Sequence, residues 1–247
     1  ACDPGALVVW PESAAWPFLY GRDADLDRDL DSMIDRGCSV LFNSSAPTGD
    51  SFYNSAFLLT PGHQPAVRYD KRHLVPFGEY VPFGQLFSFM KKLARAAGDY
   101  QPADRLTLLP WHGEKIGMSI CYEVVFPAEV AQLVRAGATL LVTITNDAWY
   151  GDTAAPWQHL RAVRFRAAES RRPLLRAAIT GVSAVVGPDG AVESEIGVFR
   201  QGTIRTWVAG QSGLTPYTRW PWLVPLLCTA VALAATLYSV VPNRSRP

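Results

Sequence analysis

The apolar positions along the chain follow two alternating periods, that of a strand and that of a helix. Residues 6–10 (ALVVW) form a short apolar run typical of a buried strand. Residues 23–36 then place apolar side chains at i, i+4, i+7 and i+8, beginning at Leu26, with Asp and Arg residues elsewhere. This spacing predicts an amphipathic helix that follows the first strand.

Further strands and helices are expected in the same alternating order. The expected strands are residues 39–42, 52–59, 66–69, 105–109, 115–120, 139–145, 174–179, 182–186, 191–196 and 203–208, and the expected helices are about 85–97, 127–136 and 157–171. Between two of the last strands, Pro188-Asp189-Gly190 is typical of a hairpin turn. Strands that alternate with helices and end in a hairpin indicate an α/β layered domain with parallel and antiparallel pairs.

An uncharged apolar run, WLVPLLCTAVALAATLYSVV, occupies residues 222–241. At about 1.5 Å per residue, a helix over this run would cross the roughly 30 Å of a bilayer core. Aromatic residues and arginines flank it, as is common at a membrane interface. The run therefore predicts a transmembrane helix, with a buried core helix as the alternative.

Composition and charge limit the classes of protein that fit. The 247 residues are 49% hydrophobic and 18% charged, and Lys+Arg 23 against Asp+Glu 22 gives a net charge of +1. These values exclude a disordered chain, a disulfide mini-protein and a highly charged nucleic-acid binder. The four cysteines lack metal-ligand spacing, and the sequence leaves their pairing open.

Two of the motifs that could carry chemistry place charged side chains near the ends of expected strands. Glu12, in WPES, follows the first strand, where a partly desolvated carboxylate can act as a base; a glutamate that caps a turn is the alternative. Lys71 and Glu79 lie in the restrained loop 69–82. A fixed lysine can stabilise a developing oxyanion, and a solvated charged loop is the alternative.

The third motif is Cys121, directly after the strand at 115–120 and shortly before a helix that begins at Pro127. Backbone N–H groups and the helix dipole are expected to lower the pKa of this thiol and favour the nucleophilic thiolate; a buried inert cysteine is the alternative. None of His63, His73, His112 and His159 has a strand-end context that pairs it with Cys121. A base, a cation and a nucleophile together suit acyl transfer through a thioester.

With these motifs the sequence resembles the nitrilase superfamily of carbon–nitrogen hydrolases, and within it the apolipoprotein N-acyltransferase branch. The matching segments are WPES (10–13), YDKRHLVPFGEYVPF (69–83), ICYEVVFP (120–127), TNDAWYGDTAAPWQHL (145–160), RAAESRRPLLRAAITGVSAVVGPDG (166–190) and GLTPYTR (213–219). The resemblance implies a nitrilase-type α-β-β-α layered sandwich in a catalytic domain over residues 1–212. A linker at 213–221, the transmembrane helix at 222–241 and a cytoplasmic tail at 242–247 would follow.

The resemblance also implies roles for individual residues. Glu12 would be the general base, Lys71 the stabiliser of the tetrahedral intermediate and Cys121 the nucleophile, with Glu79 as a supporting glutamate. Three further residues would line the pocket beside the nucleophile: Tyr122, Glu123 and Trp149. The implied reaction takes an acyl chain from a phospholipid and passes it to the α-amino group of an apolipoprotein's diacylglyceryl-cysteine. It needs no cofactor and no metal.

The resemblance also implies where the protein is located in the cell and that the chain is part of a longer enzyme. The catalytic domain would lie on the extracytoplasmic side of the bacterial plasma (inner) membrane, with Cys121 outside any disulfide. The chain would be a C-terminal portion of a longer enzyme, lacking an N-terminal strand and helix and the preceding transmembrane helices. The basic amphipathic stretch 86–95 suggests a lipid-facing lid or interfacial arm, with a core-packing helix as the alternative. Two other readings stay open: a membrane-anchored amidase or nitrilase, and an inactive truncated module.

Overall fold

The computed structural model describes residues 2–80 and 100–240. The strands are β1 (Leu7–Val9), β2 (Ser39–Thr48), β3 (Ser51–Thr60), β4 (His63–Asp70), β5 (Leu108–Trp111), β6 (Glu114–Ile120), β7 (Leu140–Asn146), β8 (Leu174–Ile179), β9 (Ser183–Val186) and β10 (Val192–Ile196). The helices are α1 (Ala24–Asp35), α3 (Pro127–Arg135), α4 (Ala155–Ser170), α5 (Pro216–Arg219) and α6 (Leu223–Val240), and 3₁₀ helices cover Cys121–Val125 and Asp147–Tyr150. The expected helix at 85–97 and the expected lid lie outside the described residues.

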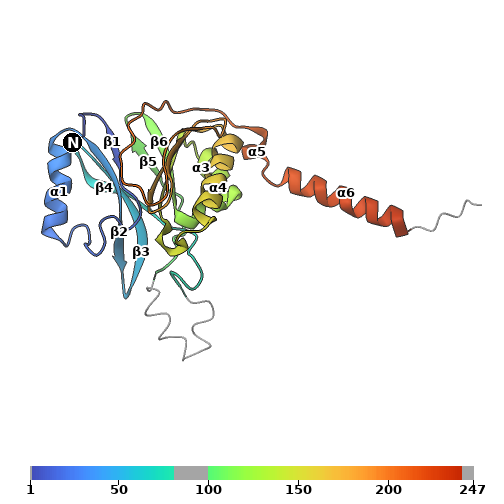
Figure 1. The fold of residues 1–247 in the computed structure, drawn as a ribbon, viewed down its shortest axis with the longest axis horizontal. Helices are drawn as coiled ribbons and strands as arrows, with labels where there is room; N and C mark the ends of the chain where they lie inside the picture. The colour runs from blue at the N-terminus through green and yellow to red at the C-terminus, as the bar shows by residue number, and fades with distance from the viewer. Residues whose placement is uncertain (1, 81–99, 241–247) are drawn as a thin grey trace, which may run out of the picture.

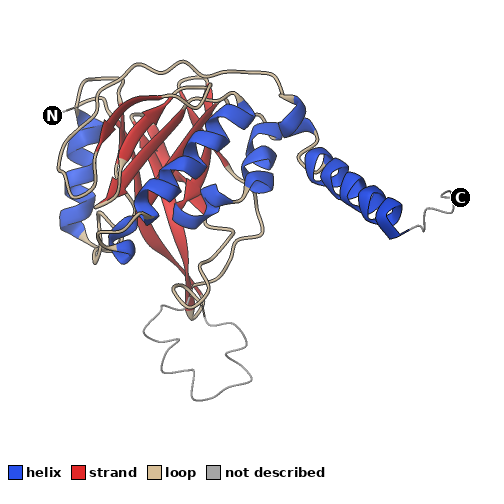
Figure 2. Ribbon diagram, turned by 45° about the vertical axis from the view of Figure 1, so that its right-hand side comes forward, coloured by secondary structure: helices blue, strands red, loops and turns tan. Residues whose placement is uncertain are grey.

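The strands form two sheets that pack face to face between helices (Figures 1 and 2). A four-stranded sheet has the order β1-β2-β3-β4, and a six-stranded sheet has the order β10-β9-β8-β7-β6-β5. In the second sheet, β6, β7 and β8 run parallel, and their neighbours at both edges run antiparallel. The predicted mixture of parallel and antiparallel pairs is confirmed.

The first outer layer is α1, which covers the four-stranded sheet. Asp23 caps this helix, because its carboxylate accepts hydrogen bonds from the backbone N–H groups of Asp25 and Leu26. Apolar side chains of α1 and of one face of the sheet form one core cluster, which includes Leu26, Leu30, Val40, Phe42 and Phe57. The amphipathic helix predicted at 23–36 therefore lies where its apolar face can be buried.

Two further core clusters complete the layers. Leu41, which points to the opposite face from its neighbours in β2, packs between the sheets with Met118 and Val142 of the six-stranded sheet. On the outer face of that sheet, α3 and α4 contribute Leu133 and Val163 to the remaining cluster. The predicted α-β-β-α sandwich is confirmed.

The observed strands differ most from the predicted ones at two places. β2 runs to Thr48, well beyond the expected end at residue 42, because it pairs with β3 along its whole remaining length. The strand expected at 203–208 is wrong: these residues form no strand, and their side chains are mostly exposed apart from Ile204 and Val208. The hairpin prediction is confirmed, with β9 and β10 antiparallel around Gly190, whose φ is +84°.

The segment after the sandwich contains two helices. Residues 213–221, expected as a linker, include α5, where Thr218 is buried and its carbonyl accepts a hydrogen bond from Arg135 of α3 at 2.7 Å. α6 then extends away from the sandwich (Figure 1).

The prediction of a transmembrane helix at 222–241 is not supported. Among residues 2–80 and 100–240, no helix is both long enough and apolar enough to cross a membrane. α6 has 18 residues. The expected tail at 242–247 lies outside the described residues.

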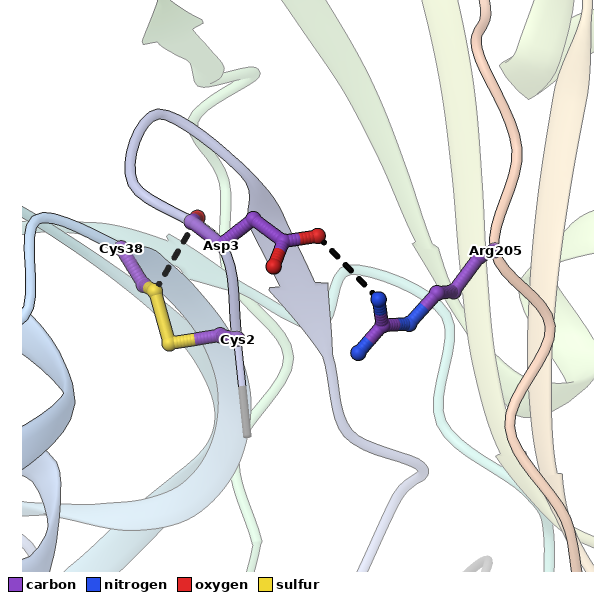
Figure 3. Close-up of a disulfide and its surroundings, with 4 residues drawn as sticks. All are labelled: Cys2, Asp3, Cys38 and Arg205. Atoms are coloured by element: carbon purple, nitrogen blue, oxygen red, sulfur yellow. Dashed lines mark hydrogen bonds and ion pairs between the residues drawn. A yellow bond between two sulfur atoms is a disulfide. The ribbon is translucent and has the colours of Figure 1, made fainter.

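A disulfide joins Cys2 to Cys38 and settles the pairing that the sequence leaves open (Figure 3). It ties the segment before β1 to the residue that precedes β2. The neighbouring Asp3 also forms an ion pair with Arg205 at 3.2 Å, but both side chains are largely exposed, so this pair contributes little stability. β1 is an edge strand of three residues, and the disulfide adds a covalent link to the backbone hydrogen bonds that hold it to β2.

Removal of this disulfide is expected to destabilise the domain. Its two cysteines are 36 residues apart, and closing a loop of this size stabilises a fold by about 3–4 kcal/mol. The double variant Cys2→Ser/Cys38→Ser should therefore melt about 10 °C lower. Thermal unfolding by circular dichroism measures the shift, with Cys228→Ser as the control because Cys228 is a free cysteine. An unchanged melting temperature in the double variant would contradict this account.

Candidate active site

Three sequence-predicted residues meet at one edge of the sandwich. Cys121 follows β6 directly, Lys71 follows β4 directly, and Glu12 comes three residues after β1. All three are buried, with 8%, 1% and 7% of their surfaces exposed. A buried lysine that lies next to carboxylates and a thiol is characteristic of a functional site and not of a solvated surface loop.

Lys71 is held between two carboxylates. Its Nζ lies 2.9 Å from Glu79 Oε1 and 3.8 Å from Glu12 Oε1. Burial by itself lowers the pKa of Lys71, but the charges of Glu12 and Glu79 outweigh this effect and raise it above its usual value. Lys71 is therefore a fixed positive charge at neutral pH.

Glu12 is oriented by two hydrogen bonds from other elements. Asn54 of β3 donates from Nδ2 to Glu12 Oε1 at 3.0 Å, and the backbone N–H of Asn146 donates to Oε2 at 2.9 Å. Asn54 also donates to Glu79 Oε1 at 2.7 Å. One amide therefore sets the positions of both carboxylates that flank Lys71.

Cys121 has a backbone conformation that only a few non-glycine residues adopt. Its φ is +53°, in the left-handed region, at the start of the 3₁₀ helix Cys121–Val125. A left-handed residue between a strand and a helix points its side chain out of the sheet edge, as nucleophile elbows do. The thiol is not part of a disulfide in this structure.

The expected thiolate is not the resting form of Cys121. Burial, together with the charge of Glu12, raises the pKa of Cys121 to about 12, although Lys71 and a hydrogen bond with Thr145 act in the opposite direction. The expectation of a lowered thiol pKa is therefore wrong, because desolvation disfavours the charged form more strongly than the nearby cation favours it. A neutral thiol must lose its proton as it attacks, which requires a base.

The raised pKa of Cys121 predicts a specific pH dependence. A group that keeps its proton up to about pH 12 gains thiolate about tenfold per pH unit between pH 7 and 10, and only the thiolate is alkylated. Iodoacetamide should therefore modify Cys121 at a rate that rises throughout this range. Glu12→Gln should move the profile to lower pH, because it removes a negative charge that raises the pKa. Peptide mass spectrometry measures both rates, and a wild-type profile that levels off below pH 9 would contradict the assignment.

The side chain of Glu123 lies in the interior. Its carboxylate accepts hydrogen bonds from Tyr69 Oη at 2.9 Å and from the backbone N–H groups of Ile120, Arg72 and His73 at 2.7, 2.6 and 3.1 Å. These donors come from β4, from the loop after Lys71 and from β6. Glu123 therefore connects the loop that follows Lys71 to the backbone that precedes Cys121.

The other two residues expected to line the pocket are more accessible. Tyr122 is half-buried, and its ring packs edge-on against His73 and Phe126, with ring centroids 5.9 and 4.9 Å away. Trp149 lies in the 3₁₀ helix Asp147–Tyr150 and is 85% exposed. Trp149 therefore lies on the surface.

Several residues of the site carry no strand-end signal in the sequence. Asn54 lies in the middle of β3, and His159 lies in the first half of α4. The sequence gives no reason to pair His159 with Cys121, because this histidine does not follow a strand. In the structure its Nε2 nevertheless lies 3.2 Å from the backbone carbonyl oxygen of Cys121. Within the described residues, no group of three or more His, Cys, Asp or Glu side chains could hold a metal ion.

Comparison with known proteins places this geometry in a family. The carbon–nitrogen hydrolase family model matches residues 6–217. The amidase from Nesterenkonia sp. AN1, in a structure with acrylamide added to its active-site cysteine, superposes with a TM-score of 0.57 at 24% identity, covering 78% of this chain and 76% of that one. This likeness shows the shared fold.

Among curated proteins, the apolipoprotein N-acyltransferases of Geobacter metallireducens, Ralstonia nicotianae and Haemophilus ducreyi are 39%, 41% and 42% identical to this chain. The matches cover 94%, 87% and 92% of this chain, but 45%, 42% and 47% of those proteins. The chain thus spans about half the length of the curated relatives that it matches. With a family match over most of its sequence, the chain belongs to the carbon–nitrogen hydrolases.

Proposed function

We propose that this chain carries the catalytic site of an N-acyltransferase, with Cys121 as nucleophile, Glu12 as general base and Lys71 as the group that stabilises the oxyanion. The observation that carries the proposal is the placement of buried Lys71 against Glu12, with the charges of both acting on the Cys121 thiol. Its curated relatives are named apolipoprotein N-acyltransferases, which favours transfer of an acyl chain to an amine.

The first half-reaction forms a thioester. Cys121 Sγ attacks the ester carbonyl of a phospholipid while Glu12 takes the thiol proton, since the raised thiol pKa keeps that proton in place until the attack. The tetrahedral oxyanion forms beside Lys71 Nζ. Collapse breaks the carbon–oxygen bond, and the proton on Glu12 passes to the oxygen of the departing lysophospholipid.

The second half-reaction transfers the acyl chain. The α-amino group of a diacylglyceryl-cysteine at an apolipoprotein N-terminus attacks the thioester carbonyl, and Glu12 accepts a proton from the amine. Lys71 again faces the oxyanion. Collapse breaks the carbon–sulfur bond, and the proton on Glu12 returns to Cys121, so the protein is regenerated with no cofactor. Glu79 keeps Lys71 in place through both half-reactions.

Both proposed substrates carry lipid chains, which suggests that the reaction takes place at a membrane surface. Three aromatic side chains near the site or on its loops are largely exposed: Trp16 (78%), Phe77 (58%) and Trp149 (85%). Aromatic side chains of this kind suit the boundary between acyl chains and water. We place the catalytic domain on the extracytoplasmic face of the bacterial plasma membrane, and the Cys2–Cys38 disulfide supports this choice because disulfides persist in oxidising compartments.

Trapping the acyl-enzyme tests the proposed chemistry. The chain is incubated in detergent micelles with a phospholipid that carries a deuterated acyl chain, quenched in acid and analysed by intact mass and peptide mapping. The expected result is one deuterated acyl group on Cys121 that hydroxylamine removes, as it does from thioesters. The exposed thiol of Cys228 is the internal control and should stay unmodified. An unmodified Cys121 in folded protein would contradict the proposal.

A further inference from the structure

A second cluster of buried polar residues lies beneath Cys121, and neither half-reaction uses it. It consists of Asp147, His159 and Arg176, which are 1%, 6% and 3% exposed. Asp147 follows β7, Arg176 lies within β8 and His159 lies on α4. Three charged or ionisable side chains at this depth require mutual partners, and the structure provides them.

The cluster is a continuous series of hydrogen bonds that ends at the nucleophile. Arg176 Nη2 donates to Asp147 Oδ2 at 2.6 Å, and Asp147 Oδ1 lies 3.1 Å from His159 Nδ1. On the other side of the ring, His159 Nε2 lies 3.2 Å from the carbonyl oxygen of Cys121. The carbonyl oxygen of Cys121 and the carboxylate oxygen of Asp147 can only accept, so both ring nitrogens of His159 carry a hydrogen in these two bonds.

The charges of the cluster are consistent with these contacts. Burial alone would raise the pKa of Asp147, but the hydrogen bond with His159 and the charge of Arg176 outweigh it, so the pKa is lowered. Asp147 also accepts a hydrogen bond from Thr145 at 2.9 Å. Asp147 is therefore a fixed carboxylate that orients the imidazole ring from the side opposite Cys121.

The space around Asp147 is shaped to keep this carboxylate in place. A Cβ added at Gly181 would collide with the side chain of Asp147, so only glycine fits there. Arg176 is held in turn by its Nε, which donates to the carbonyl of Val182 at 2.9 Å. The loop after β8 thus fixes both residues that support His159.

We infer that the Asp147–His159–Arg176 cluster positions the nucleophile: by donating to the Cys121 carbonyl, His159 holds Cys121 in its left-handed conformation. At φ +53° a non-glycine residue needs such support from its surroundings. The hydrogen bond connects the elbow after β6 to residues from β7, β8 and α4, so the direction of the thiol depends on packed elements. His159 touches the backbone of Cys121 and is a positioning residue, not a catalytic one.

A pair of substitutions separates positioning from general stability. His159→Gln keeps an N–H that can reach the Cys121 carbonyl, whereas His159→Leu keeps the bulk and loses the donor. We expect His159→Leu to slow alkylation of Cys121 by iodoacetamide at pH 9 by between about 10-fold and 10²-fold. His159→Gln should restore the rate to within about 3-fold of wild type. Cys228 in the same chain is the internal control and should react equally in all variants.

The positioning of Cys121 by His159 rests on the proposed function only in its effect on acyl transfer. The positioning and the proposed function can therefore fail separately. Wild-type protein that forms no acyl-enzyme contradicts the proposed function, while the alkylation ratio of the two variants still tests the positioning. Equal rates in His159→Leu and wild type, or equal losses in His159→Leu and His159→Gln, would overturn the inference. If His159→Leu does not fold, Gly181→Ala displaces Asp147 without touching His159 or Cys121, and it should slow Cys121 alkylation in protein whose circular dichroism is unchanged.

Discussion

Replacing Cys121 by alanine is expected to lower acyl transfer by about 10⁴-fold or more and to remove the acyl-enzyme altogether. The thiol is the only group of the proposed site that forms a covalent bond, and loss of a nucleophile removes the contribution of the residues that act with it. Cys121 packs in the core between the sheets, but alanine removes only one heavy atom, so the loss of stability should be small, on the order of 1 kcal/mol. Turnover of a labelled phospholipid and thermal unfolding measure both effects.

The matched control for this variant is Cys228→Ala. Cys228 lies exposed on α6, which extends away from the sandwich (Figure 1). Its replacement should leave turnover and the trapped thioester unchanged. Retention of more than about one tenth of wild-type activity in Cys121→Ala would exclude Cys121 as the nucleophile.

Replacing Lys71 by methionine is expected to damage both stability and catalysis. The ammonium group lies between Glu12 and Glu79. Its loss leaves the carboxylates of buried Glu12 and half-buried Glu79 without a counter-ion, at a cost of about 3–5 kcal/mol in the free energy of unfolding. The oxyanion also loses its stabilising charge, which should lower turnover by about 10²–10³-fold. Urea denaturation and initial rates measure the two losses independently.

A double variant separates the two effects of Lys71. In Lys71→Met/Glu79→Gln one of the stranded carboxylates becomes neutral, so part of the lost stability should return. Turnover should stay low, because the charge that faces the oxyanion is still absent. Recovery of turnover together with stability would mean that Lys71 acts only through folding.

The sequence predicts the positions of candidate residues best where each of them follows a strand. Lys71 and Cys121 follow their strands directly and Glu12 lies close to its own, so the alternating pattern alone places them at sheet edges. Lys71 and Glu12 follow β4 and β1, the two edge strands of the same sheet. Their approach to 3.8 Å depends on how the whole sheet is assembled and has no local signal. The same limit applies to Asn54, whose contact with Glu12 depends on the register of β3.

Electrostatic properties are harder to predict than positions. The helix dipole at Cys121 is a local feature, and by itself it suggests a lowered thiol pKa. The burial of the thiol and its proximity to the charge of Glu12 raise that pKa, and both exist only once the two sheets are assembled. The role of Glu123 is hidden in the same way, because its four donors come from three separate segments. At residues 203–208 the local pattern misleads in another way. Their alternating polarity predicts a strand, but they form a surface segment with no strand.

The central claim is that the acyl chain on Cys121 passes to an amine rather than to water. Protein carrying the deuterated acyl group is mixed with a synthetic peptide that begins with diacylglyceryl-cysteine, and with the same peptide acetylated at its α-amino group. The account predicts that the free amine receives the label as an amide while the thioester on Cys121 disappears, and that the acetylated peptide receives none. Release of the label only as free fatty acid, at the same rate with both peptides, would contradict it and identify a hydrolase.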